Sequence, residues 1–156
     1  MGAPKPSSTM PETLSLRAVT RENYEAICDL PLPPEQQAML ASNSWSLVQA
    51  AYEPGYQPRA IYLGERPVGF IMWVPESETR VSIWRFMIGK DDQGRGLGSQ
   101  ALRQAMAEIA QQPGVREIEI CYAPDNEGSR RLYARHGFVE QGLDPDGEDM
   151  LALLRL

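Results

Sequence analysis

Hydrophobic residues follow two kinds of pattern along this chain, and each pattern predicts a different element. Alternating or short continuous apolar runs are typical of strands, whereas apolar residues spaced three and four apart are typical of amphipathic helices. N-cap residues such as Thr20 and prolines such as Pro34 mark where predicted helices begin. The predicted strands are 14–19, 60–63, 67–74, 81–88, 117–122 and 150–156. The predicted helices are 21–30, 35–40, 44–52, 99–112 and a last one ending at about 136.

The most informative segment is Gln93–Ser99, which reads Gln-Gly-Arg-Gly-Leu-Gly-Ser and joins a predicted strand to a predicted helix. Its three glycines leave backbone N–H groups uncovered at a helix N-terminus, where free donors and the helix dipole favour an anion. The glycine spacing differs from the Gly-x-Gly-x-x-Gly of dinucleotide-binding loops, and the Gly-Lys-Ser/Thr of a Walker loop is absent. A glycine-rich turn without a ligand is the plain alternative. The segment therefore predicts a site for a phosphate or pyrophosphate.

A second patterned segment follows the predicted strand 117–122. It reads Asn126-x-x-Ser129-x-x-Leu132-Tyr133-x-x-x-Gly137-Phe138. Together with Gln93-x-x-Gly96-x-Gly98, it resembles the two signatures of the GNAT superfamily of acetyl-CoA-dependent N-acetyltransferases. The resemblance implies an α/β GNAT fold, with a mixed central sheet of six to seven strands flanked by helices and splayed between the fourth and fifth strands. Within the superfamily, the segments 32–72 and 84–88 look like bacterial diamine and spermine/spermidine N-acetyltransferases.

The resemblance also implies how the site works, with acetyl-CoA as co-substrate and no metal. Backbone N–H groups near Met87 and Ile88 would polarise the thioester carbonyl. Tyr133 would protonate the departing thiolate, because a phenol of pKa ~10 is matched to a thiol of pKa ~8.5; simple packing against Leu132 is its alternative role. The residues implied to bind acetyl-CoA are Met87, Ile88, Gln93, Gly94, Arg95, Gly96, Leu97, Gly98, Ser99, Asn126, Ser129 and Tyr133.

The general base is harder to assign. Many GNAT proteins carry a glutamate on the fourth strand, but the run 81–88 has none, and its only charged residue is Arg85. We expect Glu119 on the fifth strand to act as the base through a water. Pairing of Glu119 with Arg85 across neighbouring strands is the alternative. His136, the only histidine, lies in the last turn of a predicted helix, where the dipole stabilises a cationic ring, so we do not assign it a catalytic role.

Length and charge restrict the organisation of the chain. Its 156 residues predict one domain, with 1–13 as a flexible N-terminal tail and 14–156 as the GNAT acetyltransferase domain. The net charge of −6 argues against nucleic acid as a partner, and no apolar run approaches the ~18 residues of a membrane span. Cys28 and Cys121 lie in apolar stretches, which predicts reduced, buried thiols in a cytoplasmic protein. A homodimer is left open.

The expected function is transfer of an acetyl group from acetyl-CoA to a primary amine of a small molecule. A polyamine such as spermidine or spermine is the favoured class, because acidic residues, among them the turn 144–149, suit a polycation. Two alternatives stay open. One is an acetyltransferase for another amine, such as an antibiotic or a protein N-terminus. The other is a non-catalytic acyl-CoA-binding module.

Overall fold

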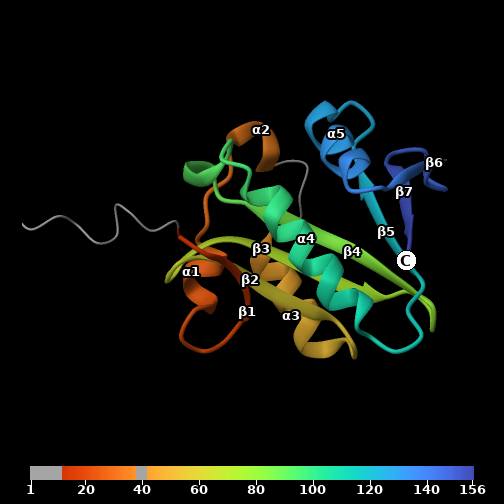
Figure 1. Cartoon of the computed structure of the whole chain (residues 1–156). Coiled ribbons are helices and arrows are strands. Elements are labelled where there is room, and N and C mark those ends of the chain that lie inside the picture. The colour runs from red at the N-terminus through yellow and green to blue at the C-terminus, as the bar shows by residue number, and fades with distance from the viewer. Residues whose placement is uncertain (1–11, 38–41) are drawn as a thin grey trace, which may run out of the picture.

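A seven-stranded mixed sheet forms the centre of the molecule (Figure 1). The computed structural model describes residues 12–37 and 42–156. The strand order is β1-β2-β3-β4-β5-β7-β6, and only β4 and β5 are parallel neighbours. The strands are β1 (Leu14–Ala18), β2 (Gln57–Leu63), β3 (Arg66–Pro75), β4 (Arg80–Ile88), β5 (Glu117–Tyr122), β6 (Val139–Leu143) and β7 (Met150–Arg155). The helices are α1 (Tyr24–Cys28), α2 (Pro34–Gln37), α3 (Asn43–Tyr52), α4 (Leu97–Ala110) and α5 (Glu127–Arg135), with a short 3-10 turn η2 (Lys90–Asp92) before α4.

The sequence predicted this mixed α/β sheet and most of its elements, with two main differences. The helix expected at 21–30 begins only at Tyr24, because Thr20 holds a turn in which its carbonyl accepts from the N–H groups of Asn23 and Tyr24. Strand β6 was not predicted, since all five of its residues are exposed and carry no apolar alternation. The second predicted helix, 35–40, and the predicted tail, 1–13, both run partly outside the described residues.

Two hydrophobic clusters cover the two faces of the sheet. On the face seen at the front of Figure 1, α4 packs through its buried residues Leu97, Ala101, Leu102, Ala105 and Ile109. On the opposite face, α1 and α3 cover a smaller cluster that includes Ile27, Phe70 and Met87. Strand β3 is buried from Val68 to Val74 because it lies in the middle of the sheet, between these two layers.

Strand β4 changes its pairing at Trp84. Its register with β3 joins Trp73 to Ile83 and Met72 to Arg85, so Trp84 is an extra residue that forms a β-bulge. The pairing of β4 with β5 ends at the same place, with Ile83 opposite Ile120. A bulge bends its strand, and β4 and β5 diverge beyond this point (Figure 1). The splay that the sequence analysis expected between the fourth and fifth strands is therefore present, and it starts at the extra residue.

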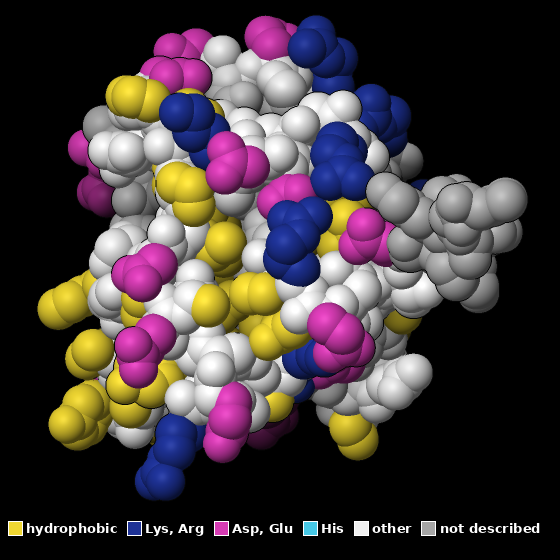
Figure 2. All heavy atoms as spheres, turned by 90° about the vertical axis from the view of Figure 1, so that its left-hand side faces the viewer, with side chains coloured by type: hydrophobic (Ala, Val, Ile, Leu, Met, Phe, Trp, Pro, Cys, Tyr) yellow, Lys and Arg dark blue, Asp and Glu magenta, His cyan; other side chains and the backbone are white. Residues whose placement is uncertain are grey.

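The surface carries both signs of charge. On the face shown in Figure 2, acidic and basic side chains are interspersed around apolar ones. The net charge of −6 therefore does not gather into one acidic area on that face. None of the helices within residues 12–37 and 42–156 is both long and apolar enough to cross a membrane.

Candidate functional site

A cavity of about 750 Å³ lies where β4 and β5 separate. This volume is within the range of about 300–1,000 Å³ that small-molecule sites occupy. The second half of β4, the loop before α4, the end of β5 and helix α5 form its walls, and Glu148 and Asp149 join them from the loop before β7. The lining residues that the sequence singled out are Met87, Ile88, Gln93, Gly94, Gly96, Leu97, Gly98, Asn126, Ser129 and Tyr133. Arg95 and Ser99 are the two expected contacts that do not line the cavity.

The loop before α4 forms a cradle of backbone donors. Gly94 and Gly96 have φ of 77° and 76°, a left-handed conformation that favours glycine. A Cβ at either position would meet no atom within 4 Å, so the backbone is open to the cavity there. Helix α4 begins directly after Gly96, which has no side chain to cap the first-turn N–H groups. Free N–H groups at a helix N-terminus bind anions, so the cradle fits the pyrophosphate of CoA.

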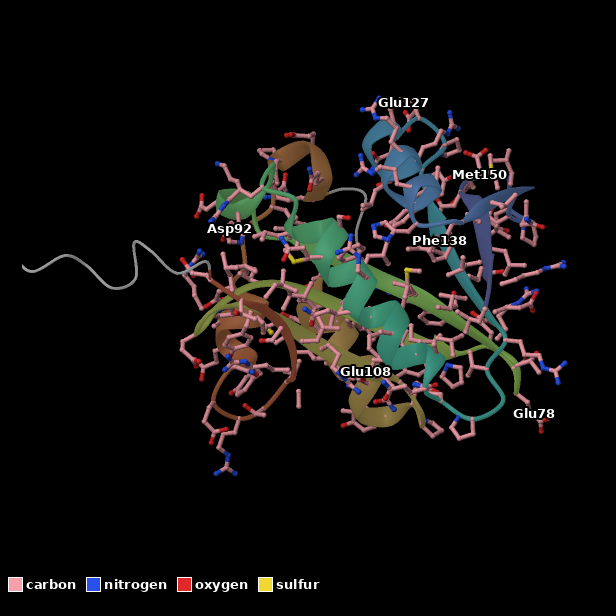
Figure 3. The ribbon with its side chains drawn as sticks, viewed as in Figure 1. Glu78, Asp92, Glu108, Glu127, Phe138 and Met150 are labelled. Atoms are coloured by element: carbon pink, nitrogen blue, oxygen red, sulfur yellow. The ribbon has the colours of Figure 1, made fainter. Side chains whose placement is uncertain are left out.

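Side chains anchor this loop from behind. The buried Asp92 carboxylate accepts from Arg66 at 2.8 Å and from Arg95 at 3.0 Å, and Arg66 above all holds the pKa of Asp92 below its usual range. Figure 3 shows Asp92 beside the start of α4. Gln93 donates from Nε2 to the carbonyl oxygen of Ile88 at 2.9 Å. The side chains of Gln93 and Arg95 therefore brace the loop, which leaves the backbone to meet the ligand.

Ser99 and His136 form a pair beside the cradle. Ser99 Oγ lies 2.8 Å from His136 Nε2, and this contact ties the first turn of α4 to the end of α5. Burial lowers the pKa of His136, and the nearby charges of Arg103 and Arg135 lower it further. The cationic ring expected at this helix end is therefore disfavoured, because desolvation and two like charges act against it.

Helix α5 positions Tyr133 at the cavity wall. Asn126 caps the helix by accepting from the N–H of Ser129 at 3.1 Å. The Tyr133 ring is buried, and its centroid lies 5.4 Å from that of Tyr122 and 5.9 Å from that of Phe138. Burial raises the pKa of Tyr133 far above its ordinary value of about 10, although a hydrogen bond with Ser129 opposes this. The hydroxyl thus stays protonated at neutral pH, which is the form that can donate a proton. The close match with the pKa of the thiol that we expected from the sequence is wrong, because burial makes the phenol a weaker acid.

Glu119 does not line the cavity; it lies two residues before Cys121, the first residue of β5 that does. Its carboxylate accepts from Arg80 at 3.3 Å, and Arg80 also holds Glu117 at 3.2 Å. The alternative partner expected from the sequence, Arg85, was wrong, because Arg80 stands opposite Glu117 in the parallel register and can reach both carboxylates. Burial raises the pKa of Glu119, and the charge of Arg80 acts in the opposite direction.

Cys121 occupies the last part of β5 and lines the cavity. The sequence predicted buried thiols, and this was wrong: Cys121 is exposed and Cys28 is partly exposed. The apolar pattern of β5 suggested burial, but the pairing of β5 with β4 ends at Ile120, so Cys121 has a neighbouring strand, β7, on one side and the open splay on the other. Desolvation by the surrounding walls raises the pKa of its thiol, and the charge of Asp149 acts in the same direction.

Trp84 and Arg85 are further wall residues that the sequence analysis did not assign to the site. Trp84 donates from Nε1 to Glu76 at 3.2 Å, and its ring meets that of Tyr56 edge-on at 5.3 Å. Arg85 donates to the carbonyl oxygen of Trp84 at 2.9 Å and to Gln49 at 3.4 Å. For Arg85 the signal was that it is the only charged residue in the run 81–88, which contains no glutamate. Trp84 carried no such signal, because a tryptophan in a strand is most simply a core residue. Among the described residues, no cluster of three or more His, Cys, Asp or Glu is arranged to hold a metal.

Comparisons with known proteins agree with this architecture. Residues 20–138 match the model of the acetyltransferase (GNAT) family. The chain is 32% identical over 147 residues to a probable spermine N(1)-acetyltransferase of Bacillus subtilis subsp. natto, covering 89% of this chain and 97% of that protein. It is 31% identical, with the same coverage, to the spermine/spermidine N(1)-acetyltransferase of Bacillus subtilis strain 168. A spermidine N-acetyltransferase of Vibrio cholerae, solved with CoA and spermine, shares the fold with a TM-score of 0.73 at 15% identity, covering 91% of this chain and 95% of that one.

Proposed function

Because the chain belongs to the GNAT family and is an acetyl-CoA-dependent N-acetyltransferase, we propose that its acceptor is a polyamine such as spermidine or spermine. The observation that carries this proposal is the make-up of the cavity. One wall contains the glycine cradle that fits a pyrophosphate, and another contains the carboxylates of Glu148 and Asp149. A polycation is held by carboxylates and aromatic faces, and Trp84 supplies an aromatic side chain in the same cavity. The names of the two Bacillus relatives support the same class of acceptor.

Different residues of the cavity wall have different roles in the reaction. The cradle around Gly94 and Gly96 holds the pyrophosphate, which places the pantetheine arm between β4 and β5. Backbone N–H groups near Met87 and Ile88 polarise the thioester carbonyl, where negative charge develops during attack. The neutral acceptor nitrogen forms a bond to the carbonyl carbon, the carbon–sulfur bond breaks, and the nitrogen releases one N–H proton to solvent as the amide forms. Tyr133 donates its hydroxyl proton to the departing sulfur and regains a proton from solvent.

The acceptor must lose a proton before it attacks. An alkylamine of pKa ~10.4 costs about 4.6 kcal/mol to deprotonate at pH 7, at 1.36 kcal/mol per pH unit. We assign acceptance of this proton to Glu119 acting through a water, because its raised pKa makes its carboxylate a better base. In Glu119→Gln the pH–rate profile should move to higher pH, since more free amine is then required. An unmoved profile would leave Glu119 as a structural partner of Arg80.

The substrate proposal is tested by measuring acetyl-CoA consumption with spermidine, spermine, putrescine and simple monoamines. For spermidine, kcat/KM should fall as salt rises, because exposed charges are screened within ~10 Å at 0.1 M salt. Glu148→Gln should raise KM for spermidine more than for a monoamine. Asp146→Asn is the matched control, since Asp146 is an exposed residue of the same loop that does not line the cavity. No turnover of any polyamine between pH 7 and 9, with turnover of another amine, would overturn the proposed acceptor and leave the family assignment intact.

A further inference from the structure

In the part of the chain that the structure describes, the cavity has one lining residue that comes from before β4. This residue is Gln36, a half-buried side chain on α2, which lies beside the loop before α4 (Figure 1). Gln93 Nε2 donates to Gln36 Oε1 at 3.0 Å, and Gln36 Nε2 donates to Gln93 Oε1 at 3.3 Å. The chain ahead of α2 is held at the same place, because the N–H of Lys90 donates to the carbonyl oxygen of Pro31 at 2.6 Å. Gln36 is therefore fixed at the edge of the glycine cradle by a reciprocal pair of amides.

The hydrogen bonds of this pair determine which way both amides face. The carbonyl oxygen of Ile88 can only accept, so the atom of Gln93 that lies 2.9 Å from it is the nitrogen. The same nitrogen also donates to Gln36, which uses both of its N–H groups. Gln36 donates one of its own two N–H groups to Gln93, and the second has no partner within the described residues. Gln93 therefore has no side-chain donor left for a ligand, whereas Gln36 has one.

The free N–H of Gln36 belongs to the same end of the cavity as the cradle. Gln36 and Gln93 line the cavity together with Gly94 and Gly96, so the amide pair and the cradle border one space. Because an amide nitrogen is planar, its second N–H points away from the hydrogen bond that the first one makes. Hydrogen bonds from N–H groups to anionic oxygens are stronger than those between neutral groups. A phosphate held by the cradle is thus the ligand group that this donor suits.

We propose that Gln36 is a further binding residue for acetyl-CoA, and that it donates its free N–H to an oxygen of the pyrophosphate. The backbone of the cradle and the amide of Gln36 then hold the phosphates from two separate segments of the chain. Gln93 is the positioning residue, because its two donors fix the amide of Gln36 relative to the end of β4. The inference rests on the proposed role of the cradle and is independent of which amine is the acceptor.

The first test compares the two halves of CoA. ADP carries a pyrophosphate without the pantetheine arm, and pantetheine carries the arm without phosphates. In calorimetric titration with CoA, and in competition by ADP and pantetheine, Gln36→Ala should weaken CoA and ADP about tenfold and change pantetheine less than about twofold, because a hydrogen bond to a charged group is lost. Gln37→Ala is the matched control, since Gln37 is the exposed neighbour on α2 that does not line the cavity, and it should leave all three affinities unchanged. Unchanged ADP affinity in Gln36→Ala, or a loss confined to pantetheine, would overturn the inference.

A substitution that changes the charge separates binding from bracing. Gln36→Glu keeps the side-chain length and the acceptor for Gln93 Nε2, but it removes the free donor and brings a negative charge to the phosphates. ADP should bind Gln36→Glu about fivefold more weakly than Gln36→Ala at low salt, and the gap should shrink as salt rises, because the repulsion is screened. Gln37→Glu adds the same charge one residue away and should show little of this loss. Normal ADP binding to Gln36→Glu, with a loss in Gln36→Ala, would make Gln36 only a brace for Gln93 and overturn the inference.

Failure of the cradle itself gives a different result. Gly96→Asp places a carboxylate where the backbone is open, so it should strongly weaken ADP binding if the cradle holds the pyrophosphate. Unchanged ADP affinity in Gly96→Asp would overturn the proposed role of the cradle, and the inference with it. A loss in Gly96→Asp without a loss in Gln36→Ala would overturn the inference alone.

Discussion

Replacing Gly96 by alanine should weaken acetyl-CoA binding while the free protein stays folded. Gly96 has a φ of 76°, and a Cβ in this left-handed region costs roughly 1–2 kcal/mol. No atom lies within 4 Å of the position that the Cβ would take, so the cost comes from the backbone and not from a clash. Gly96 is also exposed, and the loop around it can relax away from the strained conformation.

The same cost can appear in stability or in affinity. If the loop keeps its shape in the free variant, the free energy of unfolding falls by about 1–2 kcal/mol and Tm falls by about 2–8 °C, with Kd unchanged. If the loop relaxes and must return to the left-handed form when the pyrophosphate binds, Tm is unchanged and Kd rises about 5- to 30-fold. We expect the second outcome, because open space around Gly96 permits relaxation.

Calorimetric titration with acetyl-CoA and thermal unfolding of the free protein separate the two outcomes. Gly64→Ala is the matched control: Gly64 has a φ of 61° in the β2–β3 turn, and the nearest atom to its Cβ would be the end of the Glu12 side chain at 3.2 Å. That variant should lose stability and bind acetyl-CoA normally. If Gly96→Ala showed neither effect, with a combined cost below about 0.5 kcal/mol, the left-handed cradle would not be the binding conformation.

Three further outcomes are expected. Tyr133→Phe should lower kcat much more than it weakens acetyl-CoA binding, because the lost proton donor matters mainly in the transition state; wild-type turnover in rapid-mixing assays would show that water supplies the proton. Gly69→Ala should destabilise the protein by about 1–3 kcal/mol in urea titration, because its Cβ would lie 2.5 Å from the backbone oxygen of Met87 and must push β4 away. Asp92→Asn should lower stability at pH 7, and the advantage of the wild type should disappear at low pH. The pKa of Asp92 is depressed in the folded state. The stabilisation that Asp92 contributes is therefore present above the ordinary carboxyl range and is lost as pH falls through the lowered pKa. An advantage of the wild type that persisted undiminished at about pH 3 would contradict this account of Asp92.

The elements that the sequence predicted well are those whose two sides differ in polarity. Helix α4 shows this most clearly, because its buried residues recur at helical spacing on one face, and β5 alternates between the core and the opposite side. Strand β6 has no such contrast, since it lies at the edge of the sheet with every residue exposed. Its pairing with β7 depends on backbone hydrogen bonds, which apolar patterning does not reveal.

The candidate site likewise has features that the sequence predicted and features that it did not. The glycine cradle was predictable because only glycine adopts the required positive φ without strain, so the residue type indicates the backbone conformation. The partner of Glu119 and the exposure of Cys121 were not predictable, because both depend on register. Arg80 reaches Glu119 through the parallel alignment of β4 with β5. Cys121 is exposed on the side of β4 because that alignment stops at Ile83, whereas β7 still pairs with it on the other side.

The extra residue in β4 inverts the parity of every position that follows it. Before the bulge, the odd-numbered Val81 and Ile83 face the α4 layer; after it, the even-numbered Phe86 takes that side and the odd-numbered Met87 faces α1 and α3. Deleting Trp84 would turn residues 85–88 to the opposite face of the sheet. Met87 would then face α4, and Phe86 would face α1 and α3. The presence of one extra residue at the bulge therefore matters more than which residue it is. Inserting or deleting a single residue here would turn the other set of side chains toward the α4 face.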